Sequence, residues 1–120
     1  MPSDRPTADE LIASAAEYLA VNVRPALDAH GAFEALIASN LLAIALRELE
    51  LGPELRAADE HDLAGLLGRK GSLEELEAHL ADQIREGDID DRWGQVLAAL
   101  RASARRHLRI ANPEYVRLED

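Results

Sequence analysis

The segment "IASNLLAIALRELELG", residues 37–52, decides the fold expected of this chain. Leucine, isoleucine and alanine recur in it at helical spacing, on two sides of the helix rather than one. A helix that is apolar on two sides is usually the central helix of a bundle. Two polar residues, Asn40 and Arg47, interrupt the apolar pattern, and Glu48 lies at the edge of the face that they share.

Asn40 has two interpretations. An amide that is buried without a hydrogen bond costs about 1–3 kcal/mol. We therefore expect Asn40 to be buried and bonded inside the chain, to a backbone carbonyl at a helix end or to the segment "NPEY", residues 112–115. In that case Asn40, with Arg47, fixes how the helices pack. The alternative is that the two side chains open onto a groove that a partner fills.

Helix signals predict an all-α fold, a compact five-helix bundle with the second helix at its centre and a single domain over residues 1–120. Capping boxes at "TADE" and "SLEE" begin two helices, "GP" at 52–53 ends the second helix, and "GRKG" at 68–71 is a loop. The expected helices span about residues 7–24, 31–51, 53–67, 72–86 and 88–112, and the segment "EYVRLED" after Pro113 is a tail. In the last helix, the residues expected to point inward are Trp93, Val96, Leu97, Leu100, Ala104, Leu108 and Ala111.

The inventory of chemical groups predicts no enzyme activity, no cofactor and no metal site. The chain has no cysteine, which excludes disulfides and thiolate chemistry, and its four histidines form no metal-binding motif. Nucleotide-binding loops and nucleophile elbows are also missing from the sequence. The polar N-terminus does not resemble a signal peptide, and no apolar run approaches the ~18 residues that cross a bilayer. We therefore expect a cytoplasmic protein without a membrane partner.

Charge is unevenly distributed along the chain, whose net charge is −10. Residues 48–91 hold fourteen acidic and four basic residues, whereas residues 92–112 hold five arginines and no acid. An acidic chain does not attract phosphate backbones, so nucleic acid is excluded as a partner. Arg101, Arg105 and Arg109 recur every four residues on one helix face. They form either a solvated stripe paired with the chain's own acids, or a docking surface for an acidic partner or a phosphate-bearing ligand.

Four segments together resemble a known family. They are "PTADELIASAAEYL", "RPALD", "ASNLLAIALRELELGP" and "RIANPEY", and they resemble the small bacterial helical proteins of the domain of unknown function DUF6285. The last segment contains Asn112, Pro113 and Tyr115, which match the terminal Asn-Pro-x-Tyr of the family. Ser39 departs from the pattern, because an alanine is expected there.

The resemblance implies a function that the residues themselves do not state. Members of this family are encoded beside aminoglycoside-phosphotransferase-like kinases and acyl-CoA dehydrogenases. Some resemble the accessory subunit of a hydroxyacyl-CoA kinase in the catabolism of short acids. The resemblance thus implies a non-catalytic accessory subunit whose partner is such a kinase. The acyl-CoA dehydrogenase of the same pathway is a second candidate partner. The alternatives are a self-associating helical protein, which forms a homo-oligomer, and a small acyl-CoA-binding module.

Overall fold

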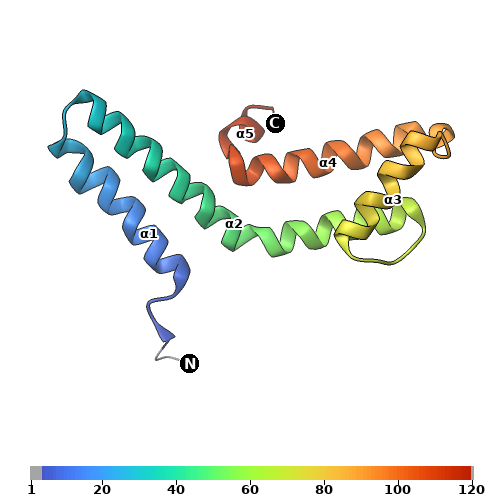
Figure 1. The fold of residues 1–120 in the computed structure, drawn as a ribbon, viewed down its shortest axis with the longest axis horizontal. Helices are drawn as coiled ribbons and strands as arrows, with labels where there is room; N and C mark the ends of the chain where they lie inside the picture. Colours follow the sequence, from blue (N-terminus) through green and yellow to red (C-terminus); the bar gives the residue numbers. More distant parts are fainter. Residues whose placement is uncertain (1–3, 120) are drawn as a thin grey trace. The chain divides into compact units, whose positions relative to one another are not determined.

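The described residues, 4–119 of the chain in a computed structural model, form five α-helices and no strand (Figure 1). Side chains are described as far as Arg117. The all-α prediction is therefore confirmed. The chain divides into two compact units, Met1–Gly52 and Pro53–Asp120. The long helix α2 contributes to both units, which agrees with the central role expected of the second helix.

Unit 1 begins with α1, Ala8–Tyr18, whose capping box forms as the sequence predicts. The hydroxyl of Thr7 accepts a hydrogen bond from the backbone N–H of Glu10 at 3.3 Å. The helix continues as a π-helical turn, η2, Leu19–Val23, and a 3-10 turn, η3, Arg24–Ala26. Pro25 lies in that 3-10 turn, because a proline cannot donate the hydrogen bond that would continue the helix.

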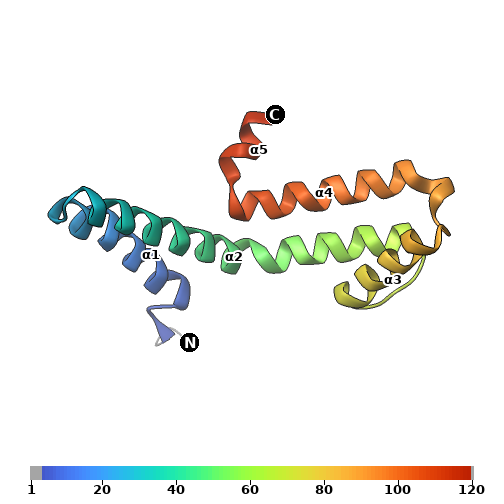
Figure 2. The same cartoon turned by 45° about the horizontal axis from the view of Figure 1, so that its top comes forward.

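The next element is α2, Ala29–Leu67. A carboxylate oxygen of Asp28 accepts the N–H of Gly31 at 2.8 Å, as expected of a residue that caps a helix. In unit 1, α2 returns alongside α1 (Figure 2). The Ser39 hydroxyl donates to the carbonyl of Ala16 at 3.2 Å, and the neighbouring Ala35 is buried. Small side chains on this face let the two helices approach closely.

The predicted helix end at Gly52 and Pro53 is wrong, because α2 runs through both residues. A left-handed backbone is found at Gly68 and Gly87 but not at Gly52. Pro53 cannot donate to the carbonyl of Leu49, and a proline inside a helix costs about 3 kcal/mol. Good helix formers on both sides and the burial of Leu55 offset that cost.

The composition of α2 also corrects a second expectation. Among the described residues, this one helix is long and apolar enough to cross a membrane, so the prediction that no apolar run approaches that length is wrong. Isolated polar residues such as Asn40 lower the mean hydropathy of a long apolar helix only slightly. The core helix of a soluble protein meets the same criterion of length and composition.

Unit 2 combines the second half of α2 with three further helices. These are α3, Leu73–Glu86, α4, Trp93–Ala111, and α5, Pro113–Glu119, with a 3-10 turn, η4, at Asp90–Arg92. Ser72 and Glu75 form the second predicted capping box, and Gly87 ends α3 with φ at 78°. The loop at 68–71 is a turn between helices, as expected. The core cluster lies in this unit and consists of Leu63, Leu66, Leu73, Leu76, Leu80, Ile89 and Val96.

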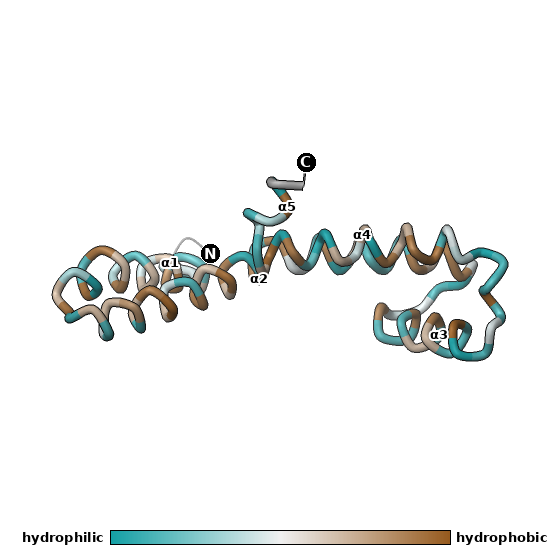
Figure 3. Tube along the Cα trace, turned by 90° about the horizontal axis from the view of Figure 1, so that it is seen from above, coloured by the Kyte–Doolittle hydropathy of each residue, from teal (hydrophilic) through white to brown (hydrophobic). Residues whose placement is uncertain are grey.

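The inward face of α4 differs from the predicted one. Hydrophobic and hydrophilic residues alternate along this helix (Figure 3), and Val96 is fully buried. Ala104 and Ala111 are exposed and Leu108 is only half-buried. The large side chains at Trp93, Leu97 and Leu100 remain 43%, 46% and 42% exposed. Half-buried Ala99, Ser103 and Arg106 share the inward face with Val96 instead, because Ser103 and Arg106 bond to carboxylates of α2.

Candidate functional site

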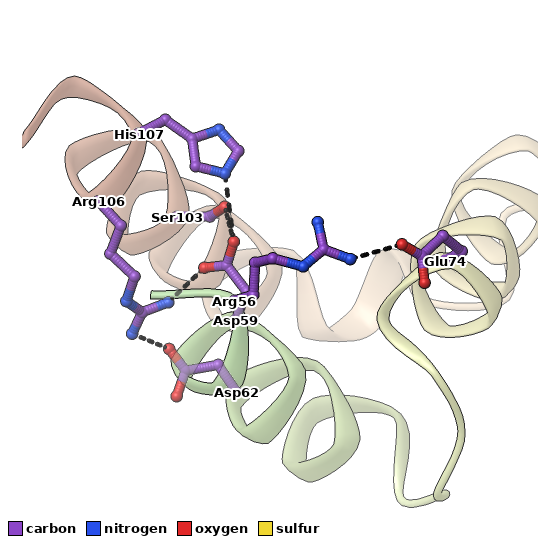
Figure 4. Close-up of polar contacts among 7 residues, drawn as sticks. All are labelled: Arg56, Asp59, Asp62, Glu74, Ser103, Arg106 and His107. Atoms are coloured by element: carbon purple, nitrogen blue, oxygen red, sulfur yellow. Dashed lines mark hydrogen bonds and ion pairs between the residues drawn. The ribbon is translucent and has the colours of Figure 1, made fainter. Parts of the chain in front are cut away.

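A network of polar side chains joins α2 to α4 inside unit 2 (Figure 4). Helix α2 contributes Asp59 and Asp62, and α4 contributes Ser103, Arg106 and His107. Residues three or four positions apart lie on the same side of a helix, so each set can face the other helix. The network is therefore a consequence of two matched spacings, Asp-x-x-Asp and Ser-x-x-Arg-His.

The buried member of the network is Asp59, which is 4% exposed. Nη1 of Arg106 donates to Oδ1 of Asp59 at 2.7 Å, and Nη2 of Arg106 donates to Oδ2 of Asp62 at 2.5 Å. The hydrogen bonds to Asp62 and to Asp59 raise the pKa of Arg106 above its ordinary value. The guanidinium group consequently stays charged, and one arginine compensates two carboxylates at the packing surface.

Ser103, His107 and Asp59 have the composition of a catalytic triad but not its order. In a triad, histidine lies between aspartate and serine and takes the serine proton. Here Asp59 lies between the other two: its Oδ2 accepts from Ser103 Oγ at 3.1 Å and is 3.3 Å from His107 Nε2. Because the Ser103 proton points at a carboxylate, this geometry ties α4 to α2 and does not activate the hydroxyl as a nucleophile.

A cavity of about 310 Å³ opens beside this network. Its apolar wall combines side chains from all three long helices of the unit, namely Leu63, Leu80, Ala81, Ile84, Ala99 and Leu100. Its polar end consists of the network residues and Glu77 of α3. Three carboxylates meet one guanidinium there, and both terminal nitrogens of that guanidinium already bind carboxylates. The cavity therefore suits an apolar group with a cationic or hydrogen-bond-donating neighbour.

A second ion pair joins α2 to α3 near the start of α3. Nη2 of Arg56 lies 2.6 Å from Oε1 of Glu74 (Figure 4). A hydrogen bond to the Glu74 backbone, together with the Arg56 guanidinium, lowers the pKa of the Glu74 carboxyl. Hydrogen bonds from the backbone and hydroxyl of Ser72 lower the pKa of Glu75 in the same turn. Both carboxylates therefore stabilise the N-terminal turn of α3 in their charged form.

Metal-binding geometry is not found within the part of the chain that the structure describes. No group of three or more histidine, cysteine, aspartate or glutamate residues is arranged there to hold a metal ion. The carboxylates of the network are instead matched by Arg106, which supplies the positive charge that a metal would otherwise supply.

Asn40 is exposed, so the prediction that it is buried and bonded inside the chain is wrong. The face of α2 that packs on α1 carries Ala35 and Ser39, because small residues let the helices approach, and Asn40 points away from that face. Arg47 is half-buried and Glu48 is exposed in the same unit.

The segment "NPEY" caps a helix of its own. Oδ1 of Asn112 accepts the N–H of Tyr115 at 3.3 Å, and Pro113 begins α5, so the predicted tail is helical through Glu119. Proline suits the first helical position, where the missing N–H has no partner to lose. Tyr115 is about half exposed. The side chain of Leu118, in the same segment, lies outside the described residues.

The arginine stripe separates into different environments. Arg101 and Arg109 are exposed, whereas Arg105 is half-buried. Together with Arg106, the side chains of Arg105 and Arg109 line a shallow cleft of about 430 Å³ with Ala102 and Val116. The arginine that carries the strongest described contacts is Arg106, which the four-residue periodicity of the stripe does not include.

The residues of the polar network were not predicted from the sequence. They are Asp59, Asp62, Ser103, Arg106 and His107. A usable signal was present for Asp59, which interrupts the apolar stripe formed by Leu55, Leu63 and Leu66. A polar residue at an apolar position of a helix needs a buried partner. The reasoning that was wrong for the exposed Asn40 would have been correct for Asp59.

The comparisons with known proteins identify a family and nothing more specific. The profile of DUF6285, described as a domain of unknown function, matches residues 25–115. This range includes α2, α3 and α4 completely, together with the network and the cavity. No curated protein and no solved structure matches the chain significantly.

Proposed function

Because the chain belongs to the DUF6285 family, we propose that it is a non-catalytic accessory subunit of a phosphotransferase-like (hydroxy)acyl-CoA kinase. The family resemblance implies the identity of the partner. The kinase would bind substrate and ATP, and this chain would stabilise or regulate it through a protein–protein interface.

One observation carries the proposal: the exposed stripe of Trp93, Leu97 and Leu100 on α4. These side chains recur at the spacing i, i+4 and i+7, which is the spacing of anchors in helix-mediated recognition. Tryptophan is enriched among the residues that dominate binding energy at interfaces. A stripe of this kind, exposed beside a cavity, is typical of a surface that a protein partner covers.

The polar network supports a binding role over catalysis. Its hydroxyl, carboxylates and guanidinium bond to one another in an order that joins two helices. An acyl-CoA-binding module is less favoured, because Arg106 at the cavity is already bonded to Asp59 and Asp62. A phosphate or carboxylate ligand would therefore meet an acidic rim.

Co-expression of the chain with the phosphotransferase-like kinase encoded beside it tests this proposal. We expect a stable complex, and W93A together with L97A should reduce the recovered complex by more than about tenfold, as the loss of a central anchor does. Y18A is the matched control, because Tyr18 is an exposed aromatic residue on α1 in the other unit. If the kinase is fully active and soluble alone and never co-elutes with this chain, the proposal is wrong. A homo-oligomer that excludes the kinase would support the self-associating alternative.

A further inference from the structure

We propose that the groove between α3 and α4 binds an amphipathic helix with a basic flank, supplied by a protein partner. This inference rests on the proposed function in assigning the helix to a partner subunit. It goes further by stating the chemistry of the segment that docks. The groove consists of the 310 Å³ cavity and the exposed stripe that borders it.

The floor of the groove is apolar and continuous. Leu100 belongs both to the stripe and to the cavity lining, so the exposed side chains of Trp93 and Leu97 lead directly to the cavity. The opposite wall is formed by Leu80, Ala81 and Ile84 of α3. An apolar side chain of the partner would fill the cavity, while further apolar side chains on its helix would cover the stripe.

The charge of the rim determines the flank of the docking helix. Glu77 on α3 is an exposed carboxylate at the cavity, and Asp62 on α2 is about one-third exposed. Asp59 lies beneath them, and Arg106 and His107 line the same cavity, where Arg106 is already bonded to Asp59 and Asp62. A lysine or arginine beside the apolar anchor would pair with these carboxylates, whereas a glutamate would be repelled.

Charge complementarity also orients the partner. Arg101 is exposed on α4 one residue after Leu100. With 3.6 residues per turn, it lies on the opposite side of the stripe from Ser103 and Arg106. The two edges of the groove therefore differ in sign. We infer that the docking helix places its basic flank toward α3 and a neutral or acidic flank toward Arg101.

The intrinsic fluorescence of the chain provides a direct measurement. Trp93 is the single tryptophan of the sequence and lies in the stripe. We would titrate the full-length protein with a synthetic helical peptide of leucine, alanine and lysine, and with a matched peptide in which glutamate replaces lysine. We expect the lysine peptide to shift the Trp93 emission to shorter wavelength at low salt, and the glutamate peptide to bind at least about tenfold more weakly.

Two substitutions separate docking in the groove from general attraction to an acidic protein. A81L should fill the mouth of the cavity and weaken the lysine peptide by more than about tenfold, since its anchor is excluded. A98L is the matched control, because Ala98 is exposed on α4 and does not line the cavity. E77Q should weaken binding about threefold and reduce its salt dependence, whereas E86Q, which removes a carboxylate elsewhere on α3, should not.

The following results would contradict the proposed docking of a basic helix in the groove. Equal binding of the two peptides, no binding of either, or equal effects of A81L and A98L would each overturn it. Tight binding of dodecylamine that A81L abolishes, without peptide binding, would assign the cavity to a small amphipathic amine. These titrations contain no kinase, so their result is independent of the co-expression test. The peptide can fail to bind although a kinase complex forms through another surface, and the peptide can bind although no kinase complex forms.

Discussion

Asp59 is the buried polar residue described in unit 2, and its carboxylate accepts hydrogen bonds from both Arg106 and Ser103. Replacing Arg106 with methionine removes the guanidinium group that pairs with this buried carboxylate. Breaking a buried pair in this way costs about 3–5 kcal/mol. We therefore expect R106M to lower the free energy of unfolding, measured by urea denaturation, by about 3 kcal/mol.

Two further variants decide whether the buried charge of Asp59 causes the lower stability of R106M. D59L combined with R106M replaces the pair by apolar groups, and such replacements are often neutral, so stability should largely return. R85A removes an exposed arginine that pairs with Asp82 on the surface of α3. It should cost less than about 1 kcal/mol. A double variant as unstable as R106M would contradict this account of the network.

Single residues also show where sequence reasoning succeeds and where it ends. The capping residues Thr7 and Ser72 were predicted correctly, because a cap depends on bonds within four residues. The environment of Asn40 was not, because burial depends on which face of α2 the neighbouring helix covers. The partners of Asp59 lie more than forty residues away on α4, and no local pattern links two such positions.

Among the elements, α2 presents the clearest test, because the sequence predicts a break at Gly52 and the structure has none. In a continuous helix, alanine is more favourable than glycine by about 1 kcal/mol. A Cβ atom at Gly52 would meet only the flexible end of the Glu48 side chain, at 3.2 Å. G52A should therefore raise the free energy of unfolding by about 0.5–1 kcal/mol.

Two other glycines serve as controls for that substitution. Gly65 lies inside α2 with no atom near its Cβ position, so G65A should stabilise the protein by a similar amount. Gly68 has φ at 64°, a left-handed conformation that alanine resists, so G68A should destabilise. If G52A behaves like G68A in urea denaturation, α2 ends where the sequence predicts.

The N-terminal turn of α3 should make stability depend on pH. Glu74 and Glu75 have pKa values below the ordinary 4.5 in the folded chain. The folded state therefore binds fewer protons, and their contribution is present above that ordinary pKa and is lost as the pH falls through the lowered folded values. The Tm of the wild type should decrease over this acidic range, and the decrease should be smaller in the variant E74Q/E75Q.

In the whole molecule, the two units differ in how much apolar surface they bury. The core cluster lies entirely in unit 2, and the buried apolar residue described in unit 1 is Ala35. The division was not predicted from the sequence, where the apolar residues of α1 and α2 resemble core residues as closely as those of α3. Periodicity identifies an apolar face, but only tertiary packing decides whether that face is covered.

Hydrogen exchange should reveal this difference directly. Amides exchange slowly where opening requires the loss of a packed core and quickly where few apolar contacts resist opening. We expect the slowest exchange of the dilute protein in the helical residues 63–67 and 73–80, which hold most of the core cluster. The amides of α1 should exchange at least about a hundredfold faster, equivalent to about 2.7 kcal/mol between the two openings.

V96A should accelerate exchange throughout unit 2, because it removes methyl groups from a fully buried position. Exchange in α1 should then change little, since Val96 is a core residue of unit 2. Equal protection of both units, or an equal response of both to V96A, would show instead that the chain opens as a single cooperative domain.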